Sequence, residues 1–197
     1  GYRGFHAGTY RVEEPSAHTA LDEANAIEQA IDWWQQVGEA VPDHEDDATA
    51  FERVTAKPVS VDGGVSEDGL ATEATLDAQF RLPPGVEGQD VEDAVAGVTD
   101  AGEMEWDEPI PPVMESPRND VARVLRAAIR EQDGEPTHLR KTGTSDMNLY
   151  AGAWDVPMAT YGPGDSSLDH APDERLDLAA FDRSVAVLTH AARSLAE

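Results

Sequence analysis

The sequence contains no cysteine and only two lysines, Lys57 and Lys141, among its 197 residues. The absence of cysteine excludes disulfides and thiolate metal sites, so any metal must be held by histidine, aspartate or glutamate. No apolar run approaches the roughly 18 residues that a membrane-spanning helix needs. No signal-peptide pattern is present either, although the chain opens at Gly1 without methionine, so a leader could precede it.

Positive charge is also scarce, because 14 Lys and Arg face 40 Asp and Glu for a formal net charge of -26. This balance excludes unaided binding to nucleic acid and to an anionic membrane surface, both of which require a basic face. High acidity is typical either of disorder or of a folded protein adapted to molar salt. We favour the second interpretation, because the acids are spread along the chain and four Trp accompany amphipathic segments. At about 1 M salt the Debye length is near 3 Å, which screens self-repulsion.

The first half of the sequence predicts a ferredoxin-like β-α-β-β-α-β module. The expected elements, in chain order, are a strand over 3–12, a helix over 22–37, strands over 51–61 and 72–82, a helix over 91–99 and a short strand over 104–106. In the first helix Ile27, Ile31, Trp34 and Val37 recur at helical spacing, which predicts that they form its buried stripe. A turn is expected at Asp62-Gly63-Gly64.

A proline-rich linker over 109–112 places a domain boundary near Val113, giving predicted domains 1–113 and 114–197. In the second domain we expect helices over 117–132 and 177–195 and short strands over 138–141 and 156–161. The last helix should bury its residues at helical spacing, which are Phe181, Val185, Leu188, Ala192 and Leu195. This alternation is typical of an α/β layer, but about 85 residues are few for an independent sheet domain.

Two loops that follow predicted strands, over 141–148 and 161–174, carry most of the reactive side chains. The first has no Gly-x-Ser-x-Gly elbow, which argues against a serine hydrolase. In the second, His170 lies among carboxylates such as Asp169 and Glu174. It is either a metal ligand or base, or a solvated loop histidine.

Two further residues admit two interpretations each. His18 precedes a helix and is either a capping or surface residue or a functional histidine. Arg81 ends a strand and binds either a substrate carboxylate or one of the many acidic side chains.

Taken together, these segments resemble the dinuclear zinc aminoacylase/carboxypeptidase family, which includes acetylornithine deacetylase and succinyl-diaminopimelate desuccinylase. The resemblance rests on Pro-Ser-Ala-His18, Phe-Arg81-Leu-Pro-Pro, Gly-Thr-Ser-Asp146, Tyr-Gly-Pro-Gly164, and His170 with Glu174 four residues later. Within the family, the segments 141–148 and 161–170 look most like the branch that releases lysine or ornithine from an amino-group carrier protein.

The resemblance implies that 1–113 is a lid, or dimerisation, domain and that 114–197 is the last part of the catalytic domain. The other metal ligands would lie upstream of Gly1, so we expect the fragment alone to be inactive. The implied cofactors are two divalent ions, zinc or cobalt. His170 is the one implied ligand in this chain, with Glu174 supporting it.

The resemblance also implies roles in substrate binding. His18 would donate a hydrogen bond to the oxyanion in a partner subunit, and Arg81 would hold the substrate carboxylate. The expected substrate-facing loop residues are Ser145, Asp146, Asn148, Gly162 and Gly164. Asn148 departs from the desuccinylases, which carry arginine at that position.

The implied protein is a cytoplasmic, metal-dependent amide hydrolase of lysine or arginine biosynthesis. Its partners would be an acidic carrier protein as substrate and a second copy of itself through the lid, with no nucleic acid and no membrane. Two alternatives stay open: a deacylase of free small molecules such as acetylornithine, and a non-catalytic dimerisation module.

Overall fold

The computed structural model describes residues 1–16, 22–41 and 47–197 and divides them into two compact units. One unit comprises Gly1–Val113 with Arg140–Leu149, and the other comprises Met114–Leu139 with Tyr150–Glu197. The segment 140–149, which carries the first of the two candidate loops, is therefore grouped with the predicted lid.

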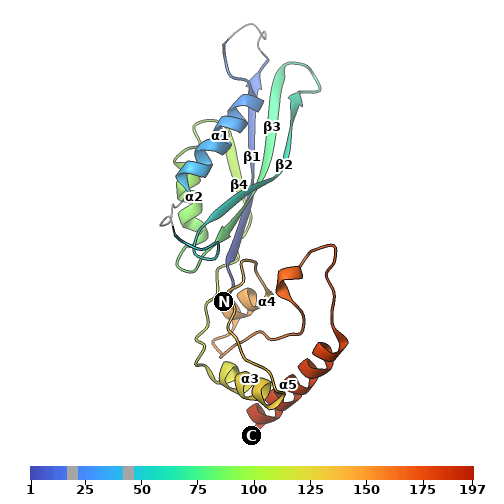
Figure 1. Ribbon diagram of the computed structural model, residues 1–197. Coiled ribbons are helices and arrows are strands. Elements are labelled where there is room, and N and C mark those ends of the chain that lie inside the picture. Colours follow the sequence, from blue (N-terminus) through green and yellow to red (C-terminus); the bar gives the residue numbers. More distant parts are fainter. Residues whose placement is uncertain (17–21, 42–46) are drawn as a thin grey trace. The chain divides into compact units, whose positions relative to one another are not determined.

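The first unit is a four-stranded sheet covered on one face by two helices (Figure 1). Its elements are β1 (Gly4–Pro15), α1 (Ala26–Ala40), β2 (Thr55–Val65), β3 (Ala71–Leu82), α2 (Gly88–Ala96) and β4 (Glu103–Trp106). All neighbouring strands in the order β2-β3-β1-β4 pair antiparallel. The predicted ferredoxin-like arrangement is confirmed, and only element boundaries shift. Gly63 and Gly64 lie inside β2, and the turn falls four residues later, over 66–70.

Strict alternation along β1 and β3 separates the two faces of the sheet. Phe80 and Leu82 are fully buried under the helices, whereas Arg81 between them points to the open face and is half-buried. On β1, Tyr10 is 1% exposed and its ring stacks on Trp33 of α1 at 3.9 Å between centroids. The indole N–H of Trp33 donates to the hydroxyl of Thr99, so this large ring is both packed and satisfied.

Of the stripe expected in helix α1, Val37 is buried and Trp34 is partly buried against the core, but the rest of the buried row differs. Ala26, Ala30, Trp33 and Val37 face the core, while Ile27 is 37% exposed and Ile31 is 53% exposed. Both rows have helical spacing, so periodicity could not separate them. The small alanines allow the helix to approach the sheet closely and bring Trp33 over Tyr10, which fixes the rotation. The helix begins after Asn25 rather than at residue 22, because Asn25 caps it through a capping box with Glu28.

The second unit contains α3 (Asp120–Glu131) and α5 (Leu178–Ala196), with the short 3-10 turn η1 (Ser166–Leu168). The helix α4 (Asp146–Ala153) begins in the first unit and ends in the second. Leu125 and Ala128 of α3 pack against Val187 and Ala191 of α5. None of the described helices is long and apolar enough to cross a bilayer.

Three expectations for this region were wrong. No strand forms over 138–141 or 156–161; Lys141 makes only an isolated bridge to Tyr2. A strand requires a neighbour that pairs its backbone groups, and the described part of the second unit offers none. The last helix buries Ser184, Val187 and Ala191 rather than the expected stripe. Helix α3 begins after Asn119 rather than at Pro117, because Asn119 accepts from the N–H of Ala122.

The core of the first unit can be tested at Leu76, which is 3% exposed beneath the helices. Leu76→Ala should lower the free energy of unfolding by about 2–5 kcal/mol through lost burial and a residual cavity. Leu70→Ala provides the matched control, because Leu70 is 72% exposed and its truncation should cost within about 0.5 kcal/mol. Denaturant unfolding in molar salt measures both. Equal losses in the two variants would contradict the assigned core.

Candidate functional site

Arg81 and the loop before α4 come together at one end of the sheet in the first unit. The guanidinium of Arg81 lies 4.8 Å from the ring centroid of Phe5, its cross-strand partner on β1. Its Nη1 donates a long hydrogen bond, 3.4 Å, to the hydroxyl of Thr144. Among the described residues no carboxylate makes an ion pair with Arg81. In so acidic a chain, an arginine held by an aromatic ring and a hydroxyl is suited to bind an external carboxylate.

A second guanidinium lies nearby but is built into the fold. Arg3 is 2% exposed and donates to the carbonyl oxygen of Ala50 and the hydroxyl of Thr55. Burial, and to a smaller extent the nearby charge of Arg81, together lower the pKa of Arg3 to about 10. Arg3 still carries its proton at neutral pH. The two cations thus create a positive region, and a bound anion would reduce the repulsion between them.

The loop over 143–148 is organised by the start of α4. The Oγ of Ser145 accepts from the N–H of Met147, and the Oδ1 of Asn148 accepts from the N–H of Ser145 at 2.9 Å. This reciprocal pattern caps the helix. Asn148 is 1% exposed, whereas Asp146 in the first turn is exposed. Of the three predicted residues in this loop, Ser145, Asp146 and Asn148, only Asp146 is exposed.

The second candidate loop lies in the other unit. Its two glycines, Gly162 and Gly164, are exposed, and Gly164 has a φ of 109°, a conformation that favours glycine. His170 is exposed and has a φ of 63°, which is rare for a residue with a side chain. The N–H of His170 donates to Oε2 of Glu174 at 3.0 Å. Glu174 thus holds the loop in the unusual conformation that presents His170.

The described residues contain no group of three or more His, Asp or Glu placed to hold a metal ion. A lone imidazole is a suitable donor for zinc or cobalt, so His170 fits such a site as one ligand. The structure gathers Arg81, Ser145, Asp146 and Asn148 in one unit and His170 with Glu174 in the other. His18 lies outside the described residues.

Sequence reasoning assigned no separate role to three residues around Arg81: Arg3, Phe5 and Thr144. Thr144 lies inside the motif that was singled out, so its position was available from the sequence. Phe5 and Arg3 become neighbours of Arg81 only through the β1–β3 register, which pairs Phe5 with Arg81.

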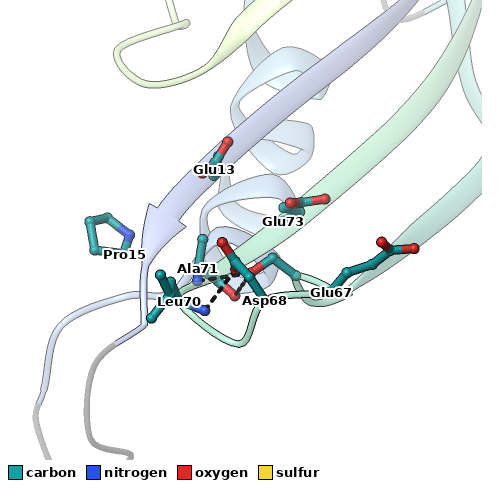
Figure 2. Close-up of a pocket in the computed structure, with 8 residues that line it drawn as sticks. Glu13, Pro15, Glu67, Asp68, Leu70, Ala71 and Glu73 are labelled. Carbon is teal, nitrogen blue, oxygen red and sulfur yellow. Dashed lines mark hydrogen bonds between the residues drawn. The ribbon is translucent and has the colours of Figure 1, made fainter.

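An open hollow lies at the opposite end of β1 and β3, beside the β2–β3 turn (Figure 2). Its lining includes four carboxylates, which belong to Glu13, Glu67, Asp68 and Glu73. None of the predicted site residues lines it. Asp68 accepts hydrogen bonds from the hydroxyl of Ser66 at 2.7 Å and from the N–H of Leu70 at 3.0 Å. Figure 2 shows Asp68 and Leu70 in this turn.

Comparison with known proteins decides the family. Residues 8–194 match peptidase family M20/M25/M40. The chain belongs to this family. The family resemblance drawn from the sequence motifs is therefore confirmed.

Among individual members, a LysW-lysine hydrolase of Deinococcus radiodurans is 42% identical over 199 residues, covering 97% of this chain and 54% of that protein. A LysW-lysine/LysW-ornithine hydrolase of Saccharolobus islandicus is 43% identical over 68 residues, which cover 34% of this chain and 19% of that protein. The chain thus spans about half the length of the Deinococcus protein.

Solved structures share the fold at low identity. An M20 family metallo-carboxypeptidase from Sulfolobus solfataricus superposes with a TM-score of 0.72 at 13% identity, over 97% of this chain and 58% of that one. The aminopeptidase PepT from Bacillus cereus gives a TM-score of 0.68 at 16% identity, over 99% and 52%. Both superpositions establish the fold of this chain.

The turn beside the hollow yields a pH prediction. The N–H of Leu70, followed by the hydroxyl of Ser66, lowers the pKa of Asp68 below its ordinary value of 3.8. Because the folded pKa is depressed, the stabilising contribution is present at neutral pH and is lost as pH falls through the lowered value. NMR titration of the carboxyl should show this, and Ser66→Ala should move the pKa back upward. An Asp68 pKa at or above 3.8 in the unmutated protein would contradict the assignment.

Proposed function

We propose that this chain is part of a metal-dependent amide hydrolase that releases lysine or ornithine from an amino-group carrier protein, in lysine or arginine biosynthesis. The observation that carries the proposal is the 42% identity to the Deinococcus LysW-lysine hydrolase across nearly the whole chain. The exposed Asp146 loop and the carboxylate-free Arg81 agree with a substrate that bears a free amino-acid carboxylate.

In this proposal the two loops and the lid have different roles in metal binding and substrate binding. Bound zinc or cobalt ions would polarise the amide carbonyl and lower the pKa of a shared water. His170 would hold one ion through its imidazole, and Glu174, which accepts from the N–H of His170, holds the loop that presents it. The described residues supply no further group of side chains that completes this ligand set. Arg81 binds the carboxylate of the amino acid. His18 donates a hydrogen bond to the oxyanion that develops on the substrate in the active site of a partner subunit.

The two loops supply further groups for binding the substrate. Ser145 and Asp146 lie in one substrate-facing loop, which the buried Asn148 holds through its backbone contacts, and Gly162 and Gly164 lie in the other. At Gly162 and Gly164 no atom lies within 4 Å of the position that a Cβ would take, so both backbones are open to a ligand. Close approach of a substrate to backbone N–H groups is a common use of such glycines.

The carrier substrate would be an acidic protein, and the enzyme a homodimer through the lid. The exposed Ile27 and Ile31 on α1, together with the exposed Val61 on the edge strand β2, offer an apolar surface for a second copy.

The metal role of His170 can be tested in the full-length enzyme, loaded with zinc or cobalt and supplied with carrier-linked lysine. His170→Ala should lower bound metal by about one equivalent and turnover by more than about 100-fold, beyond what loss of a residue supporting a ligand costs. His138→Ala is the matched control, because His138 is also exposed in the same unit. Unchanged metal content and turnover in His170→Ala would reject the assignment. Turnover of acetylornithine instead of the conjugate would favour the deacylase alternative.

The carboxylate role of Arg81 predicts a selective change in KM. Arg81→Met removes a charge-assisted pair, so KM for carrier-linked lysine should rise by about 10- to 100-fold. Arg11→Met is the matched control, since Arg11 lies on the same face of the sheet and is paired with Glu105 at 2.7 Å. Steady-state kinetics of both variants decides the matter. An equal rise in KM in both would show that only general charge is involved.

A further inference from the structure

Asn148 is a buried polar side chain whose amide joins three separate chain segments. Its Oδ1 accepts from the N–H of Ser145 at 2.9 Å. Its Nδ2 donates to the carbonyl oxygens of Arg3 at 3.1 Å and Pro111 at 2.9 Å. With 1% of its surface exposed, the side chain has its amide engaged with the backbone instead of facing a ligand.

The three segments already lie side by side where the chain enters and leaves the sheet. Tyr2 and Val113 exchange backbone hydrogen bonds of 2.9 and 3.0 Å, and Phe5 and Ile110 exchange two of 2.8 Å. Arg3 and Pro111 lie between these two pairs, and their carbonyl oxygens receive the amide of Asn148. The backbone N–H of Arg3 in turn donates to the carbonyl of Lys141. We call this arrangement of 1–5, 110–113 and 140–148 the three-segment clasp.

Only a side chain that donates twice and accepts once completes the clasp. Aspartate would accept from Ser145 but would place a negative charge against two carbonyl oxygens. An apolar residue would leave the buried groups unpaired, which is more costly than an unmade exposed bond. The neutral amide is therefore chemically required at this position, in a chain where carboxylates outnumber cations by 40 to 14.

The clasp also fixes the surroundings of Arg81. Phe5, which supports the guanidinium, is held by Ile110, and Thr144, which accepts from Arg81, adjoins the Ser145 that Asn148 caps. Both contacts of Arg81 are thus set by segments that Asn148 joins.

We propose that Asn148 is a positioning residue, which holds Thr144 beside Arg81 and thereby sets the affinity for the substrate carboxylate. This inference rests on the proposed function, in which Arg81 binds that carboxylate. It differs from a direct contact between Asn148 and substrate, because Asn148 acts through the Thr144–Arg81 pair.

The test uses the full-length, metal-loaded enzyme and the variant Asn148→Asp. Hydrogen exchange should accelerate in 1–5, 110–113 and 143–148, and KM should rise about tenfold with little change in kcat, as expected for one weakened charge-assisted bond. In the Arg81→Met background the same substitution should change KM less than twofold, because the two residues act in series. Thr144→Val, which leaves the clasp intact, should raise KM similarly without faster exchange.

Asn119→Asp is the matched control. Asn119 also accepts one backbone hydrogen bond, from Ala122, and donates two, to Met158 and Glu115, but it lies in the second unit. It should accelerate exchange around α3 and leave KM unchanged.

Three results would overturn the role of Asn148: unchanged exchange in the clasp, an undiminished KM effect in the Arg81→Met background, or an unchanged KM in Thr144→Val. The Thr144→Val result decides the question even if Asn148→Asp does not fold. If the unmutated enzyme fails to release lysine from the carrier, the proposed function fails. The exchange measurements need no substrate and would still decide whether Asn148 holds the clasp, with KM then measured on whichever amide the enzyme hydrolyses.

Discussion

The antiparallel pairing of β1 with β3 is the constraint on which the rest of the first unit depends. Twelve residue pairs fix its register, from Gly4 opposite Leu82 to Pro15 opposite Ala71. Because side chains alternate, a slip of one residue would bury Arg81 and expose Phe80 and Leu82. The burial of those two apolar side chains therefore also determines that the arginine emerges on the open face, opposite Phe5.

The local charge at the Arg81 end of the sheet is opposite in sign to the net charge of the whole chain. The formal charge of -26 is spread over the surface, whereas Arg3 and Arg81 lie close enough for one to lower the pKa of the other. Burial of the Arg3 guanidinium carries a desolvation penalty. The hydrogen bonds to a backbone carbonyl and a hydroxyl offset part of this penalty, because they replace part of the lost hydration. A local positive region in a strongly acidic protein concentrates anionic ligands at one place.

The sequence predicted the buried face of an element correctly where its pattern of apolar residues allowed only one such face. Alternation in 72–82 has only one buried face, so the strand was predicted correctly, and the position of Arg81 on the open face is a consequence of the same alternation. In α1 and α5 two rows of residues share helical spacing, and packing against neighbours, which a single sequence does not contain, selects between them. The strands expected over 138–141 and 156–161 required pairing partners that the described residues do not provide.

The candidate site was predictable to a similar extent. The motifs around Asp146 and His170 identified the family, and the comparisons confirmed it. The hydrogen bonds of Asn148 could not be predicted from the sequence. Its partners are backbone carbonyls of Arg3 and Pro111, and every residue has a backbone carbonyl. The left-handed conformation of His170 was likewise hidden, since the restraint comes from a hydrogen bond to Glu174.

The burial of the Asn148 amide affects how the loop over 143–148 responds to ionic strength and pH. Exposed ion pairs such as Arg11–Glu105 weaken as salt is added, because the Debye length falls to about 3 Å at 1 M. Hydrogen bonds between a neutral amide and buried backbone groups carry no net charge and do not titrate. The hydrogen bonds by which Asn148 holds the loop next to Thr144 are therefore less sensitive to ionic strength and pH than an exposed ion pair such as Arg11–Glu105.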